Sequence, residues 1–173
     1  EGFRIVFSNR MSMFYAIAGA FSFAPLHTML FSSEQIFVDV YDTGDKFPIY
    51  FGAVALVMTF ASFANSRILA RFGLRQVVHS GILAYCAVSI VWLAISAYGY
   101  SPFPFFFVML TLNMVFFALI AFNLPALALE PLGHIAGTAA SVVGAFQNAG
   151  SALLATFFAQ QFNGTSVPLT ATF

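Results

Sequence analysis

Five stretches of this chain run for about 20 residues or more without a single Asp, Glu, Lys or Arg. They are residues 11–33, 47–66, 77–98, 103–125 and 135–160. An α-helix needs about 20 mostly apolar residues to cross the ~30 Å hydrocarbon core of a membrane. The sequence is 61% hydrophobic and 7% charged, whereas a soluble domain carries about 25% charged residues. The sequence therefore predicts an all-α integral membrane protein with about five membrane-spanning helices.

The two ends of the chain contain no further complete span. Residues 167–173 begin another apolar stretch, and the chain starts at Glu1 rather than at an initiator Met. The first apolar stretch is too long for the core of a signal peptide. We therefore expect residues 1–173 to form a single half-domain of a larger protein, in which residues 167–173 begin a truncated final span.

The basic residues indicate how the helices are oriented in the membrane. Five of the six basic residues precede the first span or lie between the second and third spans, which places them on one side: Arg4, Arg10, Arg67, Arg71 and Arg75. Cytoplasmic connections are enriched in Lys and Arg. The connection 34–46 on the opposite side contains Asp39, Asp42 and Asp45. We therefore place the basic side in the cytoplasm and the acidic side outside.

Composition excludes several classes of function. A formal net charge of +0 with six Lys and Arg residues gives no basic surface for nucleic acid. Cys86 stands alone in an apolar run, and His27, His79 and His134 are dispersed along the chain, so the sequence predicts no disulfide framework and no metal site. Because no group of residues combines a nucleophile, a base and an acid, we expect neither an enzyme nor a bound cofactor.

The span 135–160 has small residues on one side and bulky ones on the other. At 100° per residue, the small side contains Gly137, Ser141, Gly144, Asn148, Ser151, Ala155 and Ala159. Small faces let helix backbones approach closely in lipid, so Gly137, Ser141, Gly144 and Ser151 are predicted to pack against a neighbouring helix. Amides are costly in hydrocarbon, so the alternative is that Gln147 and Asn148 line a polar transport path.

The first span contains two ionisable residues. His27 and Glu34 are seven positions apart, which places them on one face of a continuous helix, about 10 Å apart along its axis. Ionisable groups inside a membrane are functional candidates, so His27 and Glu34 are candidates for proton coupling. The alternative is that Pro25 kinks the helix and that water solvates Glu34 at the outer interface.

The fourth span contains an amide among aromatic residues. Asn113 shares a helix face with Phe106 and Phe117. Apolar walls and aromatic rings suit a cavity for flat, apolar or cationic compounds, although a hydrogen bond between helices is the alternative role for this amide. The candidate residues for a substrate cavity are therefore His27, Asn113, Gln147 and Asn148.

The connection 65–75 resembles the second-half copy of the cytoplasmic loop motif of the major facilitator superfamily. Its candidate members are Arg67, Arg71, Gly73 and Arg75. Ser66 and Ala70 stand where the motif has a leading Gly and an acid. A basic connection held in the cytoplasm, with Gly73 turning the chain, also accounts for these residues without the family.

Three further segments resemble the Bcr/CflA branch of drug-resistance transporters, in the same order along the chain. They are residues 34–41, 123–141 and 160–165. This resemblance implies a twelve-helix fold whose C-terminal bundle this chain supplies, with its spans numbered seventh to eleventh and the start of the twelfth at its end. The seventh helix of that fold also starts in the cytoplasm, in agreement with the positions of the basic residues.

The resemblance implies a function and partners. We expect proton-coupled export of small apolar or cationic drugs by alternating access in the bacterial inner membrane, driven by the proton gradient without a cofactor. The partners would be the N-terminal half of the same transporter, the lipid bilayer and the drugs. Because one fold serves many functions, a major facilitator transporter of a sugar or metabolite is the first alternative. A membrane scaffold without transport activity is the second.

Overall fold

The computed structural model describes residues 2–161 and 164–173, and this described part is helical, without strands. Residues 162 and 163, which belong to the segment 160–165, lie outside the described residues. In chain order the helices are α1 (Gly2–Ser8), α2 (Arg10–Glu34), the π-helix η1 (Gln35–Val40), the 3₁₀ helix η2 (Gly44–Lys46), α3 (Phe47–Phe72), α4 (Leu74–Ala97), α5 (Phe103–Ala121), α6 (Leu124–Leu129), the 3₁₀ helix η3 (Glu130–Ile135), α7 (Ala136–Ala159) and α8 (Val167–Thr170).

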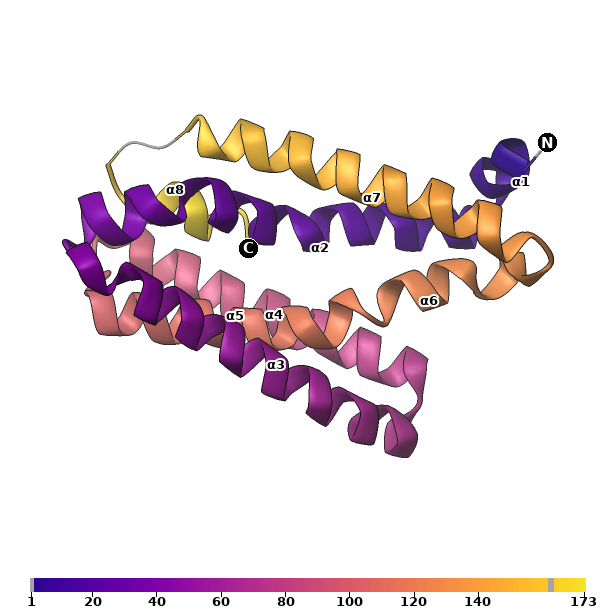
Figure 1. Cartoon of the computed structure of the whole chain (residues 1–173), viewed down its shortest axis with the longest axis horizontal. Coiled ribbons are helices and arrows are strands. Elements are labelled where there is room, and N and C mark those ends of the chain that lie inside the picture. Colours follow the sequence, from indigo (N-terminus) through magenta and orange to yellow (C-terminus); the bar gives the residue numbers. More distant parts are fainter. Residues whose placement is uncertain (1, 162–163) are drawn as a thin grey trace.

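Four helical stretches are long and apolar enough to cross a membrane. They are Arg10–Val40, Gly44–Phe72, Leu74–Ala97 and Phe103–Ala159. The last stretch folds back at η3, so that α5 and α6 run antiparallel to α7 (Figure 1). The predicted all-α membrane bundle is confirmed. Five separate crossings stay a prediction, since this last stretch contains both the fourth and the fifth predicted span.

The first helix is longer than its predicted span 11–33. It continues from α2 through η1 to Val40, and Pro25 lies inside α2 without ending it. Ile36 and Phe37 of η1 are buried, and the Phe37 ring makes edge contacts with Phe103 and Phe106 of α5. Packing of this aromatic cluster accounts for the extension, because burial of its rings offsets the entropy lost when the segment is ordered.

The predicted span 103–125 is interrupted. Helix α5 ends at Ala121, a turn follows at residues 122–123, and α6 begins at Leu124. Pro125 has no backbone N–H, and inside a continuous helix its ring would crowd the carbonyl four residues earlier. It lies instead in the first turn of α6, where a missing N–H is tolerated. The break changes the packing partners, because α5 lies mainly against α3 and α4 whereas α6 lies mainly against α2.

Two groups of helices make up the bundle. Helices α2 and α7 lie side by side, α3, α4 and α5 form the second group, and α3 diverges from α2 and α7 towards the end of the bundle where α3 ends (Figure 1). That end contains α1, the turn between α3 and α4, and η3, so the five arginines are at one end. The acidic connection between α2 and α3 is at the other end.

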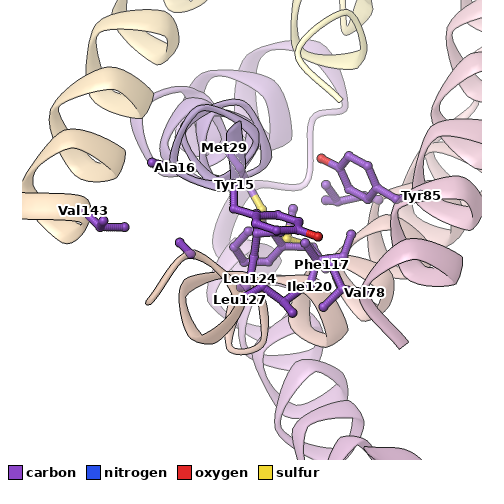
Figure 2. Close-up of a cluster of buried hydrophobic side chains, with 14 of the residues drawn as sticks. Tyr15, Ala16, Met29, Val78, Tyr85, Phe117, Ile120, Leu124, Leu127 and Val143 are labelled. Carbon is purple, nitrogen blue, oxygen red and sulfur yellow. The ribbon is translucent and has the colours of Figure 1, made fainter. Parts of the chain in front are cut away.

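The hydrophobic core lies where α2, α4, α5 and α6 meet. Figure 2 shows Tyr15 of α2 among Phe117, Ile120 and Leu124, with Val78 of α4 beside them. All of these side chains are buried. The core therefore lies between the two helix groups, at the point where α5 ends and α6 begins.

Candidate functional site

The contact between α2 and α7 is the most extensive helix contact in the described part of the chain. Buried residues recur at every fourth position of both helices. They are Ser12, Ala16, Ala20, Ala24, Thr28 and Ser32 on α2, and Ala139, Val143, Gln147, Ser151 and Ala155 on α7. Most of them are small. Because lipid supplies no hydrophobic drive between helices, small side chains stabilise the pair by allowing close van der Waals packing. We call this contact the α2–α7 seam.

Two glycines allow the close approach in the α2–α7 seam. A Cβ atom added to Gly150 would lie 3.0 Å from the Cβ of Ala20, which is closer than ordinary packing allows. The side chain of Gln147 occupies the space in which a Cβ of Gly19 would lie. The seam therefore depends on the absence of side chains at Gly19 and Gly150.

Three of the four residues predicted to pack in span 135–160 do not lie in the seam. Gly137 and Ser141 are exposed, and a Cβ added to Gly137 or Gly144 would meet nothing within 4 Å. Ser151 is buried in the seam. Residues four apart form a ridge inclined to the helix axis. The buried positions of α7 coincide with the predicted stripe at Ser151 and Ala155 and differ from it towards the start of the helix.

Gln147 and Asn148, adjacent in sequence, have different environments. Gln147 is buried in the α2–α7 seam, and its Nε2 has no hydrogen-bond partner among the described residues. Asn148 is exposed, and its Nδ2 donates to the carbonyl oxygen of Gly144 at 2.9 Å. Asn148 therefore presents polar atoms outside the bundle, whereas Gln147 lies inside it.

Asn113 joins two helices. Its side chain is fully buried, its Oδ1 accepts a hydrogen bond from Ser89 Oγ of α4 at 2.8 Å, and its Nδ2 donates to the carbonyl of Met109 at 3.0 Å. This geometry agrees with the helix–helix alternative. Asn113 is enclosed by the chain and is not available to line a cavity in this structure.

A second buried amide pair was not predicted. Asn123 Nδ2, in the turn between α5 and α6, donates to Asn65 Oδ1 of α3 at 2.8 Å and to the carbonyl of Leu119 at 2.7 Å. Asn65 and Asn123 are both buried. The sequence feature that could have predicted this pair is a single amide within or beside an apolar run. Such an amide needs a hydrogen-bond partner inside the membrane.

Three hydroxyl groups join the connections at the acidic end. Tyr41 follows η1, Ser101 lies between α4 and α5, and Ser166 precedes α8. The Tyr41 hydroxyl lies 2.8 Å from Ser101 Oγ and donates to Ser166 Oγ at 3.1 Å, and the two serine oxygens are 3.0 Å apart. This cluster stabilises the acidic end, and nothing in the three separate sequence segments predicts it.

The two proton-coupling candidates lie on one continuous helical stretch. His27 is half-buried, with Nδ1 3.1 Å from the carbonyl oxygen of Phe23 and its ring beside Phe31. Glu34 is exposed and is followed by η1, so it lies inside the helical stretch rather than at its end. Within the described residues, no hydrogen bond or ion pair joins these two side chains. Both stay candidates for proton coupling.

The connection at the basic end contacts the segment 123–141. Gly73 has a φ of 79°, a left-handed conformation that favours glycine and turns the chain from α3 into α4. Arg75 Nη2 lies 3.1 Å from Glu130 Oε2, and both side chains are more than half exposed. An exposed pair of this kind contributes about 1 kcal/mol or less. Arg67 and Arg71 are also exposed.

These observations define a multi-pass helical membrane protein whose buried amides and hydroxyls connect its helices. The chain has a curated homologue of the Bcr/CflA type, the bicyclomycin resistance protein homolog of Haemophilus influenzae, with 27% identity over 177 residues. The match covers 98% of this chain and 42% of the homologue, so the chain spans less than half the length of that relative. No protein-family model and no solved structure match the chain. The predicted resemblance is confirmed by this homologue.

Proposed function

We propose that the protein exports small apolar or cationic drugs across the membrane, coupled to protons, and that this chain supplies one half of the transporter. The similarity to a bicyclomycin resistance protein homolog over 98% of the chain carries this proposal. Helices of membrane-spanning length and the gathering of arginines at one end support it. Export is a transport activity and requires no catalytic constellation.

The substrate would bind between this half and the N-terminal half, near the middle of the membrane. Of the four cavity candidates, Asn148 is exposed and His27 is half-buried, whereas Asn113 and Gln147 are buried and would position the helices. The exposed rings of Phe14, Phe21 and Phe31 on α2 provide apolar surface and faces that attract cations. We therefore assign α2 and α7 to the wall of the cavity.

The driving force would be the proton gradient of the bacterial inner membrane, without a cofactor. Protons would bind and leave ionisable groups as the two halves rock against each other. In this chain, His27 and Glu34 are the candidates for such groups, because they lie on the helix assigned to the cavity wall.

Dye efflux from cells tests the proposed function. The intact protein is produced in cells that lack their own exporters, and these cells are loaded with a fluorescent lipophilic cation. We expect less dye to accumulate than in cells without the protein, and we expect a protonophore to abolish the difference. Equal dye retention with and without the protein would contradict drug export. Proton-dependent accumulation of a sugar or metabolite would instead support the other transporter class.

Replacing Glu34 with Gln is expected to flatten the dependence of the efflux rate on pH, because the amide can no longer take up or release a proton. The rate is measured at several external pH values with a constant dye load. Asp39→Asn is the matched control, since Asp39 is an exposed acid in η1 near the same end. The same pH profile in wild type and Glu34→Gln would leave Glu34 as an interfacial charge.

A further inference from the structure

Two arginines at the end of α3 have no carboxylate partner in the described part of the chain. Arg67 and Arg71 are exposed and four positions apart, which places them on one face of the helix. The ion pair in the described part of the chain is Arg75–Glu130, so neither Arg67 nor Arg71 has a carboxylate partner there. A guanidinium group binds phosphate through two parallel N–H donors. The face therefore presents two guanidinium groups without a carboxylate partner at the basic end.

The same face of α3 is apolar along the membrane. Large exposed side chains recur every three to seven positions before the arginines: Ile49, Leu56, Phe60 and Phe63. Phe60 is 71% exposed and Phe63 is 72% exposed. Helix α3 is also the least buried of the membrane-length stretches and diverges from α2 and α7 (Figure 1). We call Leu56, Phe60, Phe63, Arg67 and Arg71 the α3 lipid face.

The dimensions of the α3 lipid face suit one phospholipid. Leu56 and Arg67 are eleven positions apart, about 16 Å along a helix that rises 1.5 Å per residue. Half of a ~30 Å hydrocarbon core has nearly this thickness. An acyl chain lying along Leu56 and Phe63 would therefore place its headgroup at Arg67. Arg71 Cζ lies 5.4 Å from the centre of the half-exposed Phe72 ring, so an aromatic side chain also lies at headgroup depth.

We propose that the α3 lipid face binds an anionic phospholipid of the leaflet at the basic end, with Arg67 and Arg71 holding its headgroup phosphate. The charge is complementary, since the lipid is anionic and the face provides two cationic guanidinium groups. The apolar residues match the acyl chain. The site lies on α3, apart from α2 and α7, so it does not depend on the proposed drug export.

Lipid binding to the intact protein in neutral detergent tests this site. The probe is phosphatidylglycerol, compared with phosphatidylcholine and with inorganic phosphate, and native mass spectrometry counts the bound lipids during titration. An arginine near an anionic surface contributes roughly a fivefold gain in affinity, so Arg67→Gln with Arg71→Gln is expected to weaken phosphatidylglycerol binding about 25-fold. Arg4→Gln with Arg10→Gln is the matched control, since it removes the same charge at the same end but from α1 and the start of α2. Because these residues lie outside the α3 lipid face, the control is expected to weaken this binding much less than the change on α3.

Other outcomes would overturn the proposal. These are an unchanged affinity in the Arg67/Arg71 variant, an equal loss in the Arg4/Arg10 control, equal binding of phosphatidylcholine, or competition by inorganic phosphate at the lipid's own concentration. A changed oligomeric state with unchanged lipid binding would assign the face to a protein contact. Replacing Arg67 and Arg71 with Lys keeps the charge but removes the paired donors of the guanidinium group, so it tests the site even if the Gln variant fails to fold. Binding of phosphatidylglycerol is expected to be weaker than in wild type but not by the full factor of about 25 expected for the Gln variant, and a loss of that full size would contradict the site.

Discussion

Replacing Gly150 with Val is expected to lower the free energy of unfolding by about 1–3 kcal/mol, the usual cost of overpacking an interior. A Cβ at this position would lie 3.0 Å from the Cβ of Ala20. Both atoms are attached directly to backbone, so the clash can be relieved only by moving α2 away from α7. The midpoint of thermal unfolding in detergent measures the effect, and a chemical denaturation curve converts it into a free energy.

Gly144→Val on the same helix is the control for Gly150→Val. A Cβ at Gly144 would meet nothing within 4 Å, so we expect a change of less than about 0.5 kcal/mol, as at other unpacked positions. The two variants share the helix and the change in side chain, and they differ only in what the new side chain meets. Equal stabilities of the two variants would contradict the α2–α7 seam.

Replacing Asn123 with Leu is expected to destabilise the break between α5 and α6 by about 1–3 kcal/mol, the cost of leaving buried polar groups without partners. The backbone N–H of Asn123 bonds to Ile120, and its side chain donates to the carbonyl of Leu119 and to Asn65. Leucine has nearly the same size and no donor. Asn65 Oδ1 and the Leu119 carbonyl would therefore lose this hydrogen bond inside the membrane.

A double-mutant cycle isolates the bond between Asn65 and Asn123. Removing both amides costs less than the sum of the single changes, and the coupling energy is expected to be near 0.6 kcal/mol, the average for hydrogen bonds between membrane helices. Asn148→Leu is the control, since Asn148 is exposed and bonds only within its own helix in the described structure. Strict additivity of Asn65→Leu and Asn123→Leu would contradict an energetic role for this bond.

The candidate site could be predicted only in part. Amides in apolar spans marked Asn113, Gln147 and Asn148 as special, since a polar group in hydrocarbon needs a partner or a function. Whether each amide has a hydrogen-bond partner or a function depends on residues that are distant in the sequence. Ser89 of α4 provides the partner of Asn113, Gly19 of α2 leaves the space for Gln147, and Asn148 projects outside the bundle.

The sequence by itself determined that this protein lies in a membrane and which of its connections lie at the same end. Long apolar runs make membrane helices, because only a helix satisfies its own backbone hydrogen bonds in lipid, and the structure gathers five arginines at one end as the sequence predicted. Only the tertiary structure decided which small residues meet. Gly137, Gly144 and Gly150 are all glycines of α7, yet only Gly150 lies close to α2. Which residues of a helix make contact depends on where the second helix lies and on the angle at which it crosses the first. The size and spacing of the residues in one helix do not specify that position or that angle.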